Sequence, residues 1–323
     1  MGAFGLQTHI WNNNLKSVAL LAGFPVLLLF LMYGLSVGYV GLTAPINNVS
    51  EGLVLAFEHL KRIWPFAFLG AAVWFAIAWF SYQSMIEASV GARGLTRKEA
   101  PELYNLLENL CVSRGVTMPQ LNIIETPALN AFASGLTDKS YKVTVTRGLL
   151  DTLDKDELEA VLAHELTHIM NRDVRLLIIA VIFVGVFSFF GELVFRNLFR
   201  AGVRVGGHTR SRNGDSRGGG VLILIAIAMI VIAYLLALVI RFSLSQKREY
   251  LADAGAAELT RNPDAMISAL KKISGRSKID APNDIQQMMI ENTQPFAGIF
   301  ATHPPIGKRI DALVNFAGGV QIP

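Results

Sequence analysis

His164-Glu165-Leu166-Thr167-His168 lies in a segment that begins at Asp154 and contains neither proline nor glycine. Asp154 and Glu157 have the spacing of a capping box, which predicts a helix through this stretch. Because residues four apart share one face of a helix, the two histidines can aim their imidazoles at one point and bind zinc there. Glu165 lies beside them and can accept a proton from a water. The same five letters also occur by chance on solvated helices, so the rest of the chain decides.

The composition indicates a membrane protein. The chain has 323 residues, of which 52% are hydrophobic, and a mean hydropathy of +0.42. A soluble domain is about 45–50% apolar even with glycine counted. Apolar runs with the length of a bilayer crossing lie at about residues 18–40, 63–82, 176–195 and 221–240. The first is too long for a cleaved signal peptide, so we expect a mainly α-helical membrane protein with about four transmembrane or membrane-inserted helices.

These runs divide the chain into alternating membrane and soluble regions. Residues 1–90 are predicted to form an N-terminal transmembrane hairpin, and residues 174–242 a second membrane hairpin with an Arg/Gly-rich loop at 196–220. Residues 91–173 and 243–323 are the two halves of a predicted catalytic region, and the first half carries the H-E-L-T-H helix.

Three short segments before that helix predict a small β-sheet, because they are apolar, small or β-branched: residues 121–125, 130–135 and 142–146. Further upstream, Thr96-Arg97-Lys98-Glu99 has capping-box spacing, so we expect a helix to begin there.

Acidic residues after the fourth apolar run offer a further metal ligand. Glu249 and Asp253 are four apart and share a helix face, so one can bind the metal while the other supports a ligand. Such a pair on its own usually belongs to a solvated helix, and its weight comes from the H-E-L-T-H segment. His303, in Thr302-His303-Pro304-Pro305, either stabilises an oxyanion or simply begins a helix, with Arg309 a turn further on.

Charge and cysteine content exclude some classes. The net charge is +4 with an isoelectric point of about 9.2, but basic clusters beside apolar spans reflect membrane topology. No basic patch interleaved with aromatic residues is present, so we expect no nucleic acid partner. Cys111 is the single cysteine, which rules out an intramolecular disulfide.

Basic residues give a divided signal for membrane orientation. Those that favour a cytosolic catalytic region are Arg93, Arg97, Lys98, Arg172, Arg175, Arg241, Lys247 and Arg248. Lys61, Arg62 and the arginines of the loop at 196–220 favour the opposite orientation, which would fit a second hairpin that does not cross completely.

The chain resembles the HtpX-type membrane zinc metallopeptidases, relatives of the CAAX prenyl proteases, along essentially its whole length. The resemblance is carried by T-H-I-W-N-N-N-L at 8–15, N-A-F-A-S-G at 130–135, H-E-L-T-H at 164–168, E-Y-L-A-D at 249–253, and T-H-P-P at 302–305 with Arg309. It implies a zincin-like α+β catalytic region with a small β-sheet, and one Zn²⁺ per chain.

The resemblance also implies roles for particular residues. His164, His168 and Glu249 are expected to bind the zinc, with Glu165 as general base and Asp253 supporting a ligand. An edge strand formed by Asn130, Ala131, Phe132 and Ala133 is expected to pair with the substrate backbone. His303 and Arg309 are expected near the transition state.

The function expected from the resemblance is cleavage of misfolded or damaged membrane proteins, or of unfolded polypeptides, in the stress response. The location expected is the cell inner membrane, in contact with lipid, with a cytosolic catalytic region. A CAAX-type prenyl protease is the alternative within the same class, although its large chamber needs more spans. A non-catalytic scaffold disagrees with the intact Glu165, and a transporter would need ionisable residues in mid-span, where these runs have almost none.

Overall fold

A computed structural model of the chain describes residues 6–200, 217–242, 247–281, 283–286, 288–291, 303–317 and 319. It divides into two compact units, each made of separate parts of the sequence. The membrane unit comprises Val18–Trp79 and Ala180–Arg241. The sheet unit comprises Met1–Ser17, Phe80–Ile179 and Phe242–Pro323. The structure therefore assigns both halves of the predicted catalytic region to the sheet unit.

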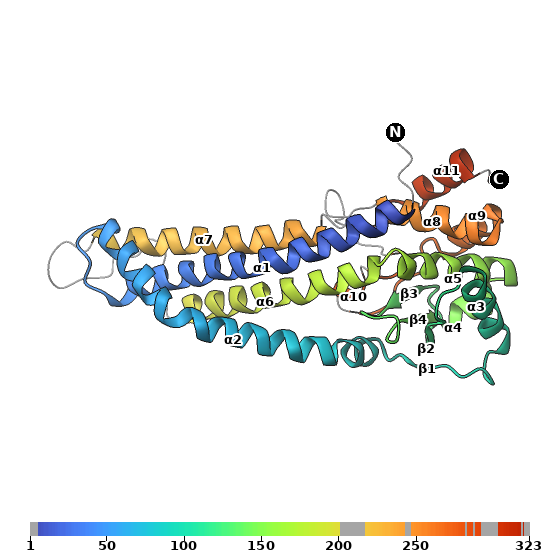
Figure 1. Cartoon of the computed structure of the whole chain (residues 1–323), viewed down its shortest axis with the longest axis horizontal. Coiled ribbons are helices and arrows are strands. Elements are labelled where there is room, and N and C mark those ends of the chain that lie inside the picture. Colours follow the sequence, from blue (N-terminus) through green and yellow to red (C-terminus); the bar gives the residue numbers. More distant parts are fainter. Residues whose placement is uncertain are drawn as a thin grey trace. The chain divides into compact units, whose positions relative to one another are not determined.

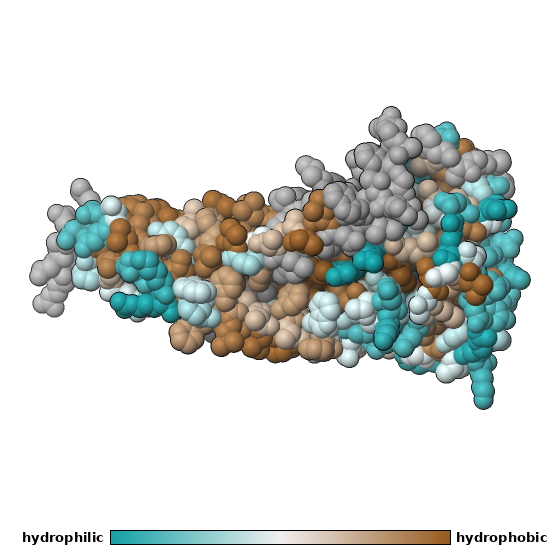
Figure 2. Space-filling view, viewed as in Figure 1, coloured by the Kyte–Doolittle hydropathy of each residue, from teal (hydrophilic) through white to brown (hydrophobic). Residues whose placement is uncertain are grey.

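Four long helices supply the membrane unit: α1 (Leu6–Thr43), α2 (Val49–Val90), α6 (Asp173–Arg200) and α7 (Arg217–Phe242) (Figure 1). Among the described residues, three helical segments are long and apolar enough to cross a membrane: Ala22–Thr43, Val49–Val90 and Gly218–Ala237. Phe66, Leu69 and Ile77 of α2 are exposed. The space-filling view shows hydrophobic residues over much of the surface of the long helices (Figure 2). Exposed apolar residues along a spanning helix are what a lipid environment requires.

Glycines let α1 and α7 approach closely within the membrane unit. A Cβ on Gly34 would lie 3.1 Å from Met229 Cβ, and one on Gly38 would lie 3.2 Å from Ala226 Cβ. A Cβ on Gly41 would meet the carbonyl oxygen of Gly219 at 3.1 Å. In a membrane, where apolar burial gives little driving force between helices, such close backbone contact is a main source of association.

The sheet unit is built on a four-stranded sheet of order β1-β2-β4-β3. Its strands are β1 (Arg93–Gly94), β2 (Gln120–Ile124), β3 (Ala131–Ser134) and β4 (Lys142–Thr146). β2 and β4 are parallel, β3 is antiparallel to β4, and β3 lies at the edge. The three predicted strand segments are confirmed, and the two-residue β1 is an addition that its sequence did not indicate.

Helices cover this sheet and carry the predicted site. They are α3 (Pro101–Arg114), α4 (Arg147–Thr152), α5 (Lys155–Met170), α8 (Lys247–Thr260), α9 (Pro263–Ile273), α10 (Asn283–Gln286) and α11 (Ile306–Ala317). α5, which contains the H-E-L-T-H segment, packs against β3 and β4 and against α3, α8 and α9. It is therefore the central helix of the unit.

The start of α5 follows the sequence prediction. Asp154 accepts the backbone N–H of Glu157, and the Glu157 carboxylate accepts the N–H of Asp154, which completes the capping box. Glu157 is buried and also accepts hydrogen bonds from Ser268 and Lys272 of α9. The cap thus orients α5 and joins it to a helix from the other half of the chain.

Two predicted boundaries were wrong. The Glu99 carboxylate accepts the N–H and hydroxyl of Thr96 as expected, but these bonds stabilise a turn, and α3 begins only at Pro101. Proline suits the first helical position, so the helix starts there. The predicted loop at 196–220 also begins later, because α6 continues to Arg200. Residues 201–216 of that loop lie outside the described residues.

The α1–α7 contact can be tested by filling one of its close approaches. Gly38→Leu should destabilise the protein by about 1–3 kcal/mol, because overpacking forces the two helices apart. The matched control is Gly23→Leu on the same helix, where an added Cβ would meet nothing within 4 Å. Thermal unfolding in detergent measures both. Equal melting temperatures for the two variants would contradict the proposed packing.

Candidate metal centre

Helices α5 and α8, which belong to the two halves of the predicted catalytic region, bring three candidate ligand side chains together. His164 and His168 lie on α5 with their Nε2 atoms 3.1 Å apart. Glu249 of α8 places its carboxylate oxygens 3.6 Å from each of those nitrogens. The close approach of α8 depends on Gly255, since a Cβ there would lie 2.5 Å from Thr167 Cγ2. A small residue at this crossing therefore allows the third group to reach the histidines.

The geometry of this cluster fits a small divalent cation. Ligands at about 2.0–2.1 Å from a tetrahedral zinc are about 3.3–3.4 Å from one another, close to the separations found here. The carboxylate of Glu249 is buried among histidine nitrogens, since His164 Nε2 and His303 Nδ1 lie 3.6 and 3.2 Å from its Oε2 atom. Burying a carboxylate is costly unless its charge is paired, and a bound cation would compensate that charge. Two imidazoles and one carboxylate also form a donor set typical of catalytic zinc.

A carboxylate contacts the Nδ1 atom of each histidine, on the side of the ring away from the cluster. Asp253 Oδ1 lies 3.0 Å from His164 Nδ1, and Asp173 Oδ2 lies 3.2 Å from His168 Nδ1. Carboxylates in this position fix the ring orientation and make imidazole a better ligand. Burial alone would lower the pKa of His164, but the carboxylates of Asp253 and Glu249 outweigh it and raise that pKa to about 9. The negative charge around the cluster thus favours a cation.

Asp173 is a site residue that the sequence reasoning missed. It begins α6, five positions after His168, and a helix running straight on from α5 would carry it away from the cluster. Instead, Arg172 adopts a left-handed backbone conformation with φ of 59°. Such a conformation is uncommon outside glycine and clusters at functional sites. It turns the chain so that Asp173 lies beside His168, and the local sequence pattern gave no sign of this turn.

Glu165 has the environment of a general base. Its side chain is buried beside the candidate metal ligands, and the backbone N–H of Ala133 in β3 hydrogen bonds to it. Burial raises the pKa of Glu165 above its ordinary value. A general base works best when its pKa lies near the working pH, so a raised pKa makes the Glu165 carboxylate a more effective proton acceptor and donor.

His303 and Arg309 lie close to Glu249 but in different settings. His303 Nδ1 is 3.2 Å from Glu249 Oε2, and His303 contributes to the cleft beside the cluster. Arg309 is fully buried, binds Asp253 through two N–H groups at 2.6 and 2.8 Å, and donates to the carbonyl of Ile290. Arg309 therefore contacts the residue that supports His164, whereas His303 borders the space where a substrate would lie.

The predicted substrate strand is divided between structural and cleft-lining residues. Asn130 is buried, and its side chain binds the backbone carbonyls of Ser277 and Glu291 and the N–H of Ile290. Ala131 accepts the N–H of Ile290 through its carbonyl, and Phe132 forms a β-bridge with Met289. Ala133 borders the metal cleft.

The cleft beside the cluster is narrow, with a volume of about 20 Å³. Polar and apolar residues share its lining: Ala133, Glu165, His168, Asp173, Val174, Leu177, Arg248, Glu249, Met288 and His303. A cavity of about 10–15 Å³ accommodates one water molecule, so the enclosed part of this cleft is small.

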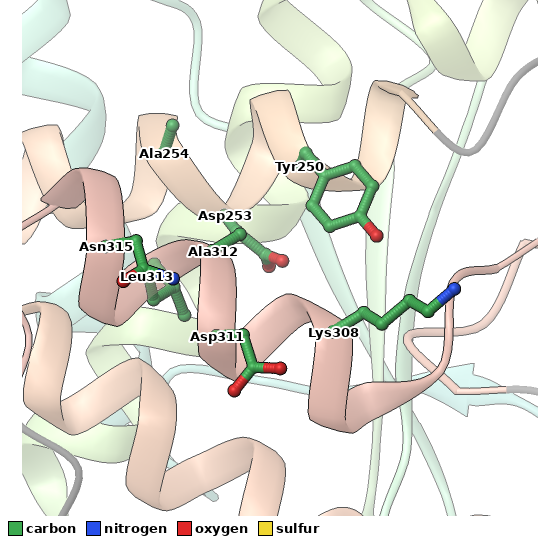
Figure 3. Close-up of a pocket in the computed structure, with 8 residues that line it drawn as sticks. All are labelled: Tyr250, Asp253, Ala254, Lys308, Asp311, Ala312, Leu313 and Asn315. Atoms are coloured by element: carbon green, nitrogen blue, oxygen red, sulfur yellow. The ribbon is translucent and has the colours of Figure 1, made fainter.

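A larger pocket of about 450 Å³ lies between α8 and α11, and Figure 3 shows its lining. Tyr250 lines it from α8, and Lys308, Asp311 and Asn315 line it from α11. None of the three candidate metal ligands lines this pocket. Asp253 lines it and also contacts His164 of the cluster. We therefore assign the chemistry to the narrow cleft.

Comparisons with known proteins agree with that chemistry. The model of "Peptidase family M48" matches residues 97–317. A protease HtpX homolog of Bacteroides fragilis is 44% identical over 97% of this chain and 99% of that protein. One of Listeria monocytogenes is 37% identical over 96% of this chain and 99% of its own length. The crystal structure of S. mikatae Ste24p aligns at 19% identity with a TM-score of 0.43, over 94% of this chain and 66% of that one.

The protein is thus a membrane-embedded metallopeptidase. Within that class the chain belongs to peptidase family M48, as the match over more than half its length shows.

The role of Asp173 leads to a test of metal affinity. Asp173→Ala should weaken zinc binding on the order of 10- to 100-fold, because His168 loses the carboxylate that orients it. Asp173→Asn should lose less, since its amide oxygen can still accept the imidazole N–H. Chelator competition on the purified protein measures the affinity. Asp151→Ala, which removes an exposed acid of α4, is the matched control. An affinity for Asp173→Ala equal to that of this control would remove Asp173 from the site.

Proposed function

We propose that this protein is a zinc-dependent endopeptidase of the cell inner membrane that cleaves misfolded or damaged membrane proteins and unfolded polypeptides. The observation that carries the proposal is the cluster of His164, His168 and Glu249 with Glu165 buried beside it. That donor set favours zinc over calcium or magnesium, which prefer oxygen ligands alone.

The chain's own residues account for the proton movements of peptide hydrolysis. Zinc, when bound, supplies a Lewis acid that polarises the peptide carbonyl and lowers the pKa of a water to about 7. Glu165 accepts the proton of the attacking water on its carboxylate and later donates it to the nitrogen of the leaving amine. His303, at the edge of the cleft, donates a hydrogen bond to the oxygen on which negative charge develops.

Arg309 contributes by position, since it holds Asp253 and through it His164. Its guanidinium is engaged by Asp253 and by the carbonyl of Ile290, so it is not directed at a substrate. We assign it a structural part in the proposed mechanism, which replaces the direct role that the family resemblance implied.

Substrate binding is proposed at the Ala133 end of β3, because residues 289 and 290 already pair with Ala131 and Phe132. An extended peptide that adds to a sheet edge is held by backbone hydrogen bonds, which make little demand on sequence. This mode suits a protease that acts on many damaged proteins. Ala133 is the part of β3 that borders the cleft, and its N–H already faces Glu165.

Connectivity supports four membrane crossings with the site on one side. α7 has 26 residues, about 39 Å at 1.5 Å per residue, against about 30 Å for the hydrocarbon core. Both halves of the sheet unit belong to one compact body, so the chain that leaves through α6 has to return through α7. If α7 crosses, α6 crosses as well, and its 28 residues suffice. We place the sheet unit in the cytosol.

The proposed catalytic role of Glu165 has a direct test. Glu165→Gln should reduce cleavage of an unfolded protein in detergent by at least about 100-fold, because the general base is lost. Zinc content should stay at the wild-type level, since all three ligands remain. Glu159→Gln, the same change elsewhere on α5, should leave cleavage unaltered. Turnover by Glu165→Gln at the wild-type rate would exclude this mechanism.

The orientation of the protein in the membrane can be determined by thiol labelling, because the native cysteine does not react. Cys111 is buried, and burial raises the pKa of its thiol to about 11, which leaves almost no reactive thiolate. In intact spheroplasts a membrane-impermeant maleimide should label Asn47→Cys, at an exposed position between α1 and α2. Lys98→Cys, at an exposed position in the sheet unit, should react only after lysis. The reverse pattern would place the site outside the cytosol.

A further inference from the structure

The cleft beside the candidate metal ligands has an apolar part with no role in the proposed chemistry. Ala133, Val174, Leu177 and Met288 line it, on the same cavity as Glu165 and His168. They come from β3, from the first turns of α6 and from the segment after α10. An apolar wall next to a catalytic cluster is where the side chain of a bound peptide would be buried.

Three of these four residues have little conformational freedom. Ala133 belongs to a paired strand, and Val174 and Leu177 lie one turn apart on α6. All three are buried. Their side chains are short or branched, so they have little freedom to move aside.

Met288 differs from the other three because its backbone is anchored while its side chain is adjustable. Two residues further on, the N–H of Ile290 is bound by Ala131 and Asn130, and its carbonyl is bound by Arg309. The Met288 side chain itself is only partly buried, and it has three rotatable bonds and no branch. Met288 therefore determines how wide the apolar part of the cleft can become.

We propose that Met288 is a specificity-determining residue, which limits the substrate residue beside the scissile bond to a small uncharged side chain such as that of glycine, alanine or serine. With a cleft of about 20 Å³, a larger side chain enters only if Met288 rotates away. The inference rests on the proposed function, since it concerns which polypeptides the same site accepts.

The experiment uses the full-length protein in detergent with zinc and reduced, alkylated casein as an unfolded substrate. Mass spectrometry of the products identifies the residues on both sides of each cut. In the wild type, small residues should be enriched on one side of the cut. In Met288→Ala, cuts beside leucine and phenylalanine should rise roughly tenfold relative to cuts beside alanine, within the range expected for added methylenes in an apolar pocket. Met288→Phe should shift the ratio in the opposite direction.

Met85→Ala is the matched control, because Met85 is exposed on α2 and does not line the cleft. Its pattern of cuts should equal that of the wild type. A second measurement needs no variant: in a synthetic peptide that the wild type cleaves, replacing the flanking alanine by leucine should lower kcat/KM roughly tenfold. This result would hold even if Met288→Ala folded poorly.

The outcomes separate this inference from the proposed function. Cleavage with the same flanking preference in the wild type and Met288→Ala, or a wild type that already favours leucine and phenylalanine, would overturn the role of Met288 alone. A wild type that cleaves no better than Glu165→Gln would overturn the proposed protease function, and the specificity inference with it.

Discussion

A buried guanidinium at Arg309 holds the sheet unit together where the candidate ligands meet. It lies on α11, binds both carboxylate oxygens of Asp253 on α8, and through Asp253 supports His164 on α5. Removing one partner of a buried ion pair costs about 3–5 kcal/mol, because the other charge is left uncompensated. These contacts therefore hold the three helices in one arrangement and preorganise the candidate ligands. Such preorganisation matters because misplacement by about 1 Å can lower catalysis about 100-fold.

The order of elements in the chain explains why this interaction is needed. The H-E-L-T-H helix ends before α6, and Glu249 comes only after α7. The chain therefore passes through the long helices α6 and α7 between the two parts of the site. The glycines of α1 facing α7 and the single glycine at the α5–α8 crossing serve the same purpose, close backbone approach, in the membrane unit and in the sheet unit. Local sequence forms the helices, and these long-range contacts decide whether the site exists.

Sequence patterns predicted the parts of the fold that depend on neighbouring residues. The capping box at Asp154, the three main strands and the spacing of the two histidines are of this kind. Asp173 could not be found, because its position depends on the left-handed turn at Arg172. The pairing of residues 289 and 290 with β3 was missed for a related reason: partners 157–160 positions apart leave no local period to read.

That pairing changes what the edge of β3 can offer a substrate. Alternate residues of a strand present their backbone groups to the same edge, so Ala131 and Ala133 both face away from β4. Ile290 already occupies the carbonyl of Ala131, which shortens the edge available to an extended peptide. With fewer backbone hydrogen bonds to gain, a substrate is selected more by the side chain it places next to the metal cluster. A short edge and the apolar part of a narrow cleft therefore lead to one result, in which binding tolerates many sequences but limits the size of one residue.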